Sequence, residues 1–323
     1  ANVELFTDNM QMLKGKFIWQ NVLLKRLAAL LYAARGERIN MSALQESYEL
    51  IKENTKMLSY FRGNSLMSIA TLLSFHDDKK KQFAGTLTVY DQMKASKFRA
   101  SDYLVIAAYQ IAGGTDKDQY AVTIERTRVF YDGMKAQHRW ITGQNDYIFA
   151  AMLGLSDIEI KSGLKQIEML HRALKPHFRP ADGVQALSQV LALGGEGRDM
   201  VSRVLDLSDK FRQRGMRLDR AYTLPSLGVL SLLPSSGDTL ADEVIEVYEL
   251  LRTKKGFGRW SVSKQELLLL SSALISFDYA DKASNHLLTS ALSTSLTNII
   301  IAQQTAIAIM IATSSSAAAS SGS

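Results

Sequence analysis

The stretch FRGNSLMSIATLLS at residues 61–74, followed by MKASKFRASDYLVIAAYQIA at residues 93–112, decides the fold. Each stretch holds a phenylalanine followed by an arginine (Phe61 and Arg62, Phe98 and Arg99), then a short polar segment and a uniformly apolar run. The two arginines are 37 residues apart. Self-similarity at a spacing of this size is typical of proteins built from repeated helical hairpins.

An arginine beside a bulky apolar residue recurs along the chain at spacings of 37, 40, 40, 38 and 42 residues. Before each arginine, apolar residues recur three and four positions apart, which predicts a helix with one buried face. After each arginine comes a polar turn with a residue able to cap a second, more apolar helix. The arginines are Arg62, Arg99, Arg139, Arg179, Arg217 and Arg259, and the expected caps are Ser65, Asp102, Asn145, Asp182, Thr223 and Ser263.

Four of the expected caps are followed five residues later by a small residue. A small side chain at this position lets a neighbouring helix approach closely, as the internal helices of a stack require. The pattern therefore predicts which helices are internal. The small residues are Ala70, Ala107, Ala150 and Gly228.

The two ends of the chain differ from the repeats. Residues 9–35 are predicted to form one long amphipathic helix with Trp19 on its apolar side, ending at Gly36. After Lys282 there is no charged residue for 41 positions. The most apolar run there, Ile299 to Ala312, has 14 residues, fewer than the roughly 20 that a membrane span needs. A terminal helix packed on the last repeat is the favoured interpretation; a membrane anchor and a self-association surface are the alternatives.

No segment alternates with the period of a β-strand, so the predicted fold class is all-α, an α-solenoid-like stack of helical hairpins with a period of about 40 residues. A compact helical bundle is the competing arrangement. We expect a single helical-repeat domain at residues 1–313, with N-terminal helices and a first half-unit at 1–61, repeats at 62–282 and a C-terminal capping helix at 283–313. Residues 314–323 are expected to be a flexible tail of Ser, Ala and Gly.

The composition excludes several kinds of chemistry. The chain has 323 residues and no cysteine, so disulfides, thiolate catalysis and cysteine-bound zinc or iron–sulfur clusters are excluded. The opening ANVELFTDNM lacks the basic and apolar run of an export signal, and a cytoplasmic location is expected. The formal net charge of +6 is mild for this length.

Motifs for catalysis or cofactor binding are not found in the sequence. No two of the five histidines have the i, i+4 spacing of a zinc-binding helix. The glycines Gly194, Gly195 and Gly197 lack the lysine of a phosphate-binding loop, and a turn between helices explains them better. We therefore predict no catalytic residue, no metal ligand and no cofactor.

The two stretches quoted above and FIWQNVLLKRLAALLYAARG at residues 17–36 resemble the bacterial domain-of-unknown-function family numbered four thousand and three. The resemblance extends along nearly the whole chain. It implies a helical bacterial cytoplasmic protein, and it implies no activity and no functional residue.

The six arginines are the candidate binding residues, because equivalent positions of stacked repeats fall along one edge. Guanidinium groups in a row would suit phosphate or carboxylate groups, and the bulky neighbours would suit stacking on bases. The competing interpretation is structural, since an arginine at a helix end binds the last carbonyls. The leading functional hypothesis is a non-enzymatic scaffold that binds a protein or peptide. The alternatives are binding of RNA or single-stranded nucleic acid by the arginine edge, and an enzyme with a dispersed site in an inter-helix pocket; membrane binding is not favoured, and the oligomeric state is left open.

Overall fold

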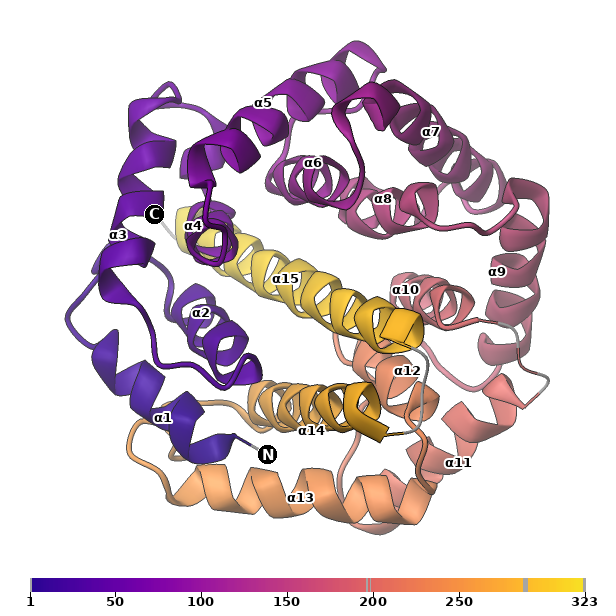
Figure 1. Ribbon diagram of the computed structural model, residues 1–323. Coiled ribbons are helices and arrows are strands. Elements are labelled where there is room, and N and C mark those ends of the chain that lie inside the picture. Colours follow the sequence, from indigo (N-terminus) through magenta and orange to yellow (C-terminus); the bar gives the residue numbers. More distant parts are fainter. Residues whose placement is uncertain (1, 196, 198, 287–289, 322–323) are drawn as a thin grey trace. The chain divides into compact units, whose positions relative to one another are not determined.

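The computed structural model describes all residues except 1, 196, 198, 287–289 and 322–323 (Figure 1). The described part of the chain contains fifteen α-helices and three short 3-10 helices and no strand. The all-α prediction is therefore confirmed. The helices are α1 (Val3–Met12), α2 (Val22–Ala34), α3 (Met41–Glu53), α4 (Leu66–Ser74), α5 (Lys79–Ala95), α6 (Asp102–Gly114), α7 (Tyr120–Gln137), α8 (Tyr147–Leu155), α9 (Ile160–Leu174), α10 (Ala181–Leu193), α11 (Met200–Gln213), α12 (Leu224–Leu232), α13 (Gly237–Thr253), α14 (Lys264–His286) and α15 (Ser290–Ser321).

The chain divides into two compact units. The N-terminal unit consists of residues 8–160 and 304–323, and the C-terminal unit consists of residues 1–7 and 161–303. Two kinds of helix alternate in each unit. Outer helices such as α11 bury one face, whereas nearly every residue of inner helices such as α4 and α12 is buried.

In the N-terminal unit, α3, α5 and α7 form the outer layer and α2, α4, α6 and α8 the inner layer (Figure 1). Each outer helix packs on the inner helix that follows it, and neighbours within a layer also touch. The last part of α15 belongs to this unit, where Asn64 Nδ2 donates to Thr313 Oγ1 at 3.3 Å.

In the C-terminal unit, α11 and α13 are neighbouring outer helices. The inner helices are α10, α12 and α14, and α12 packs between the other two. The small residue predicted at Gly228 has the expected role: a Cβ there would lie 2.7 Å from Leu187 Cδ1 of α10. The first part of α15 packs here, and Gln303 Nε2 donates to Ser226 Oγ at 2.5 Å. Residues 296–315 of α15 are long and apolar enough to cross a membrane by composition alone. Most of that stretch is buried in the fold, as in a core helix.

The single helix predicted at residues 9–35 is wrong. The chain turns between α1 and α2, because Gly15 and Phe17 adopt positive φ values of 72° and 47° and Asn21 caps the new helix by accepting from the Leu23 amide at 2.9 Å. Trp19 consequently lies in the turn with 89% of its side chain exposed, not on a buried helix face. The predicted end at Gly36 is confirmed, since α2 ends at Ala34 and Gly36 has a φ of 70°.

Three of the six predicted helix caps are shifted. Ser65 and Thr223 occupy the expected cap positions, but their side chains do not accept from the first helical turn. The hydroxyl of Ser263 does, accepting from the Glu266 amide at 3.2 Å. The caps of the other three helices are Ser101, Asp146 and Pro180 instead of Asp102, Asn145 and Asp182.

The way in which the outer helices end explains why a bulky residue precedes the arginine, most clearly after α5 and α11. Lys97 and Gly215 take left-handed conformations, and the amides of Phe98 and Met216 donate back to carbonyls in the last turn at 3.1 and 2.9 Å. In this helix ending the residue after the left-handed position packs back on the helix. Phe98 is accordingly 3% exposed, and the next residue, Arg99, is turned outward.

Candidate binding edge

All six candidate arginines lie in connections that lead from an outer helix to the following inner helix. The half-buried Arg62 donates to the carbonyls of Lys52 and Thr55 at the end of α3, which is the structural role expected for an arginine at a helix end. The other five are exposed. In the described part of the chain only Arg217 of these five has an ion pair, 3.8 Å from Asp219. Among the described residues, no hydrogen bond or ion pair holds the guanidinium groups of the remaining four, which are Arg99, Arg139, Arg179 and Arg259.

In the N-terminal unit these connections lie next to one another. The Ser65 amide at the start of α4 donates to the carboxylate of Asp102 at the start of α6, at 2.8 Å. The Arg99 amide donates to the hydroxyl of Tyr147 at the start of α8, at 3.1 Å. The starts of three inner helices therefore form one edge. Burial raises the pKa of the Asp102 carboxyl, and hydrogen bonds from Ser65 partly oppose that rise.

The connection between α1 and α2 packs on the C-terminal half of α3, which leads to this edge, through Tyr48. The ring of Phe17 lies 5.2 Å from the Tyr48 ring, and the Lys52 ammonium lies 5.4 Å from the centre of that ring. We call the connections 13–21, 54–65, 96–101 and 138–146 together the basic edge. They carry seven basic residues and one acidic residue, the buried Asp146: the basic ones are Lys14, Lys16, Lys56, Arg62, Lys97, Arg99 and Arg139.

The connections that lead from inner to outer helices in the same unit have the opposite charge. Residues 35–40, 75–78, 115–119 and 156–159 contain three basic and seven acidic residues. The N-terminal unit therefore has one basic and one acidic set of connections, which the mild net charge of the chain does not reveal.

The C-terminal unit has a corresponding edge. A Cβ on Gly183 near the start of α10 would lie 2.7 Å from Ala221 Cα, so the connection before α12 packs directly on α10. The Lys264 ammonium at the start of α14 donates to the Gly215 carbonyl at 2.9 Å. The connections 175–180, 214–223 and 254–263 contain eight basic residues and one acidic residue, Asp219.

Large apolar side chains are exposed among these charges in the N-terminal unit. The most exposed is Leu58, at 96%, followed by Trp140 at 92% and Trp19 at 89%. Arg139 lies over the ring of Trp140, 5.5 Å from its centre. The sequence indicated Trp140 as a neighbour of an arginine, but the exposed pair Met57 and Leu58 carries no signal of its own.

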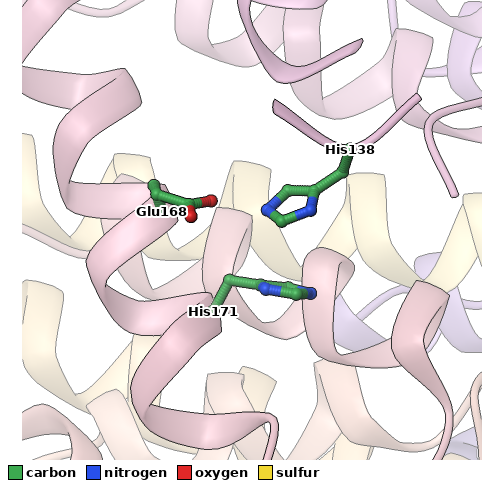
Figure 2. A group of neighbouring side chains, drawn as sticks. All are labelled: His138, Glu168 and His171. Carbon is green, nitrogen blue, oxygen red and sulfur yellow. The ribbon is translucent and has the colours of Figure 1, made fainter. Parts of the chain in front are cut away.

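One acid–histidine pair lies on a single helix, and the spacing between histidines in the sequence does not reveal it. Glu168 and His171 lie one turn apart on α9 and project from the same side of it (Figure 2). His171 is buried, at 2% exposure. In the N-terminal unit, His76 Nε2 lies 2.8 Å from the Tyr109 hydroxyl, and burial lowers the pKa of His76.

The fold and the edge define an all-α protein of alternating outer and inner helices with a basic set of connections. The chain belongs to a family without a known activity, since the family model described as "Protein of unknown function (DUF4003)" matches residues 9–306. The resemblance seen in the sequence is thereby confirmed. The comparisons find no match among curated proteins or solved structures.

Proposed function

We propose that the protein is a non-enzymatic binding protein, an α-solenoid-like stack of helical hairpins whose basic edge holds a polyanionic partner. The observation that carries the proposal is the state of Arg99 and Arg139. Both are exposed, and within the described residues no carboxylate or carbonyl holds their guanidinium groups. Such groups are free to form bidentate hydrogen bonds to phosphate or carboxylate oxygens.

The surroundings of these arginines strengthen the attraction for anions. The N-termini of α4, α6 and α8 and the C-termini of α3, α5 and α7 lie along the same edge and carry opposite partial charges, so the seven basic side chains set the sign of the charge there. The carboxylates at the edge are held by backbone amides: Asp146 is 2% exposed and accepts from the Gly143 amide at 2.8 Å, and Asp102 accepts from the Ser65 amide at 2.8 Å. The positive charge of the basic edge restricts the partner in both hypotheses, a protein or peptide and an RNA, to molecules with dense negative charge.

Binding of two polyanions, heparin and polyuridylate, over a range of salt concentrations tests the proposal. We expect log K to fall linearly with log salt concentration, because basic side chains release bound counterions. The triple variant Lys56→Glu, Arg99→Glu, Arg139→Glu is expected to bind at least about tenfold more weakly, since each basic residue near an anionic surface contributes roughly 1 kcal/mol.

The matched control is Lys80→Glu, Lys81→Glu, Lys117→Glu, which makes the same change in net charge at exposed positions next to the acidic connections. The control is expected to stay within about twofold of wild type. Equal weakening in both variants would mean that net charge, and not the edge, controls binding. Absence of salt-dependent binding in the wild-type protein would overturn the proposal.

A further inference from the structure

The basic edge of the N-terminal unit displays apolar side chains that charge alone does not explain. In monomeric soluble proteins an exposed apolar cluster rimmed by polar groups marks an interaction surface. These side chains come from three connections, 13–21, 54–65 and 138–146. They are Ile18, Trp19, Met57, Leu58, Tyr60 and Trp140, exposed by 66, 89, 81, 96, 45 and 92%.

Apolar and basic residues are interleaved within single connections. Lys16 stands two positions before Ile18, Lys56 immediately precedes Met57, and Arg139 immediately precedes Trp140. A surface that approaches this edge therefore meets positive charge and apolar side chains together. Segments with tryptophan and aliphatic residues next to lysine and arginine are suited to the interface of an anionic membrane, where the rings lie among headgroups and the cations pair with lipid phosphates.

We infer that the polyanionic partner is the surface of an anionic phospholipid bilayer, and that the connections 13–21, 54–65 and 138–146 insert into its headgroup region. The inference rests on the proposed function and identifies its partner. It needs no membrane span: α15 stays in the fold, and the contact is made by the connections.

The side-chain shapes favour a bilayer over a nucleic acid. Single-stranded nucleic acids bind by stacking their bases on flat aromatic rings or guanidinium planes. Met57 and Leu58 are flexible aliphatic chains with no flat face, yet they are among the most exposed residues of the edge. An acyl-chain boundary accepts such side chains without a preformed pocket.

Tryptophan fluorescence tests the inference directly, because all three tryptophans of the chain are exposed: Trp19, Trp140 and Trp260, the last at 102%. The free protein is expected to emit as tryptophan does in water. Vesicles of phosphatidylcholine with phosphatidylglycerol are expected to shift the emission to shorter wavelength in the full chain carrying Trp260→Phe, which leaves the two edge tryptophans as reporters. Vesicles of phosphatidylcholine alone are expected to cause no shift.

A second variant separates lipid insertion from charge. Met57→Ser, Leu58→Ser keeps every charge and is expected to lower partition into anionic vesicles by about tenfold or more, while heparin binding stays unchanged. The control Val122→Ser, Val129→Ser removes exposed apolar side chains from α7, away from the edge, and is expected to leave both kinds of binding unchanged.

The outcomes distinguish the two proposals. If the wild-type protein binds neither heparin nor vesicles, the proposed function is overturned. Heparin binding without vesicle binding, or vesicle binding without the emission shift, would overturn the lipid inference alone. A shift produced by polyuridylate and not by vesicles would assign the edge to nucleic acid instead.

Discussion

Arg126 and Arg203 are expected to be the main stabilising arginines of the two units. In the N-terminal unit, Arg126 of α7 donates to three carbonyls in the last turn of α8 and the loop after it: to Gly154 at 3.1 Å and to Ser156 and Ile158 at 2.9 Å each. The acceptors lie 28, 30 and 32 residues ahead of the arginine.

Arg203 of α11 repeats this arrangement in the C-terminal unit. It donates to the carbonyls of Ser231, Leu233 and Ser235 at 2.8, 2.7 and 3.4 Å, again 28, 30 and 32 residues ahead. The same separations recur with an offset of 77 residues (203 − 126), about twice the spacing between the arginines of neighbouring connections. Each arginine thereby satisfies carbonyls that the end of an inner helix leaves without partners.

Methionine at either position keeps much of the apolar chain length and donates no hydrogen bond. A hydrogen bond from a charged donor contributes about 1.5–3 kcal/mol net. Both guanidinium groups are half-buried, so water replaces part of what is lost, and we expect each variant to lose about 2–3 kcal/mol rather than the sum of three bonds. This loss is a substantial part of the 5–15 kcal/mol that typically stabilises a protein.

Urea unfolding followed by circular dichroism at 222 nm measures the loss. Arg126→Met and Arg203→Met are both expected to lower the midpoint, whereas the control Arg99→Met at an exposed position is expected to stay within about 0.5 kcal/mol of wild type. If both variants fall within that range as well, the hydrogen bonds of these arginines do not stabilise the inner helices and the reasoning is refuted.

Lys97 and Gly215 hold the same left-handed position after their helices, with φ values of 67° and 73°. Lys97→Gly is expected to stabilise the protein by about 1 kcal/mol and Gly215→Ala to destabilise it by a similar amount; a shift of the urea midpoint in the same direction for both would contradict this. Gly183→Ala places a Cβ 2.7 Å from a backbone atom of the neighbouring connection and is expected to cost about 1–3 kcal/mol, so an unchanged midpoint would mean that the two segments can separate freely. The pKa of Asp242 lies below its ordinary value because Arg214 donates to its carboxylate at 2.6 Å; the pair therefore adds stability above pH about 4, which is lost as the pH falls through the lowered pKa. In Arg214→Gln the pKa of Asp242, followed by NMR titration, is expected to rise toward the ordinary value, and an unchanged pKa would show that Arg214 is not its cause.

The sequence predicts the helical hairpins because the period depends on local rules. Phe98 and Met216 are buried just after a left-handed residue, and the arginine that follows each must point outward. The same left-handed ending closes α5 and α11, and a buried phenylalanine also precedes Arg62 and Arg179, so the helix ends are visible as a spacing of about 40 residues. Helix type and position follow from the same local patterns.

The features that the sequence does not reveal depend on contacts between distant residues. Asp102 looks like a cap in the sequence, but its carboxylate binds the Ser65 amide of another hairpin. Trp19 fits an amphipathic helix, yet a turn at Gly15 and Phe17 exposes it. Arg126 has no local motif, because its three acceptors lie in the next helix and the loop after it.

The charge of the basic edge has a structural cause as well as a functional interpretation. Outer helices begin beside acidic residues such as Asp77 and Asp78 and end beside basic ones such as Lys56 and Lys97, which is the order that the helix dipole favours. The dipole of the outer helices, taken without the opposing dipole of the inner helices, would therefore give one acidic and one basic set of connections. It gives no reason for Leu58 to be 96% exposed, since an exposed apolar side chain gains nothing from a helix end and loses the free energy of burial. The apolar side chains, and not the positive charge, are thus what distinguishes a membrane-binding edge from ordinary helix ends, and serine at positions 57 and 58 is the substitution that separates the two explanations.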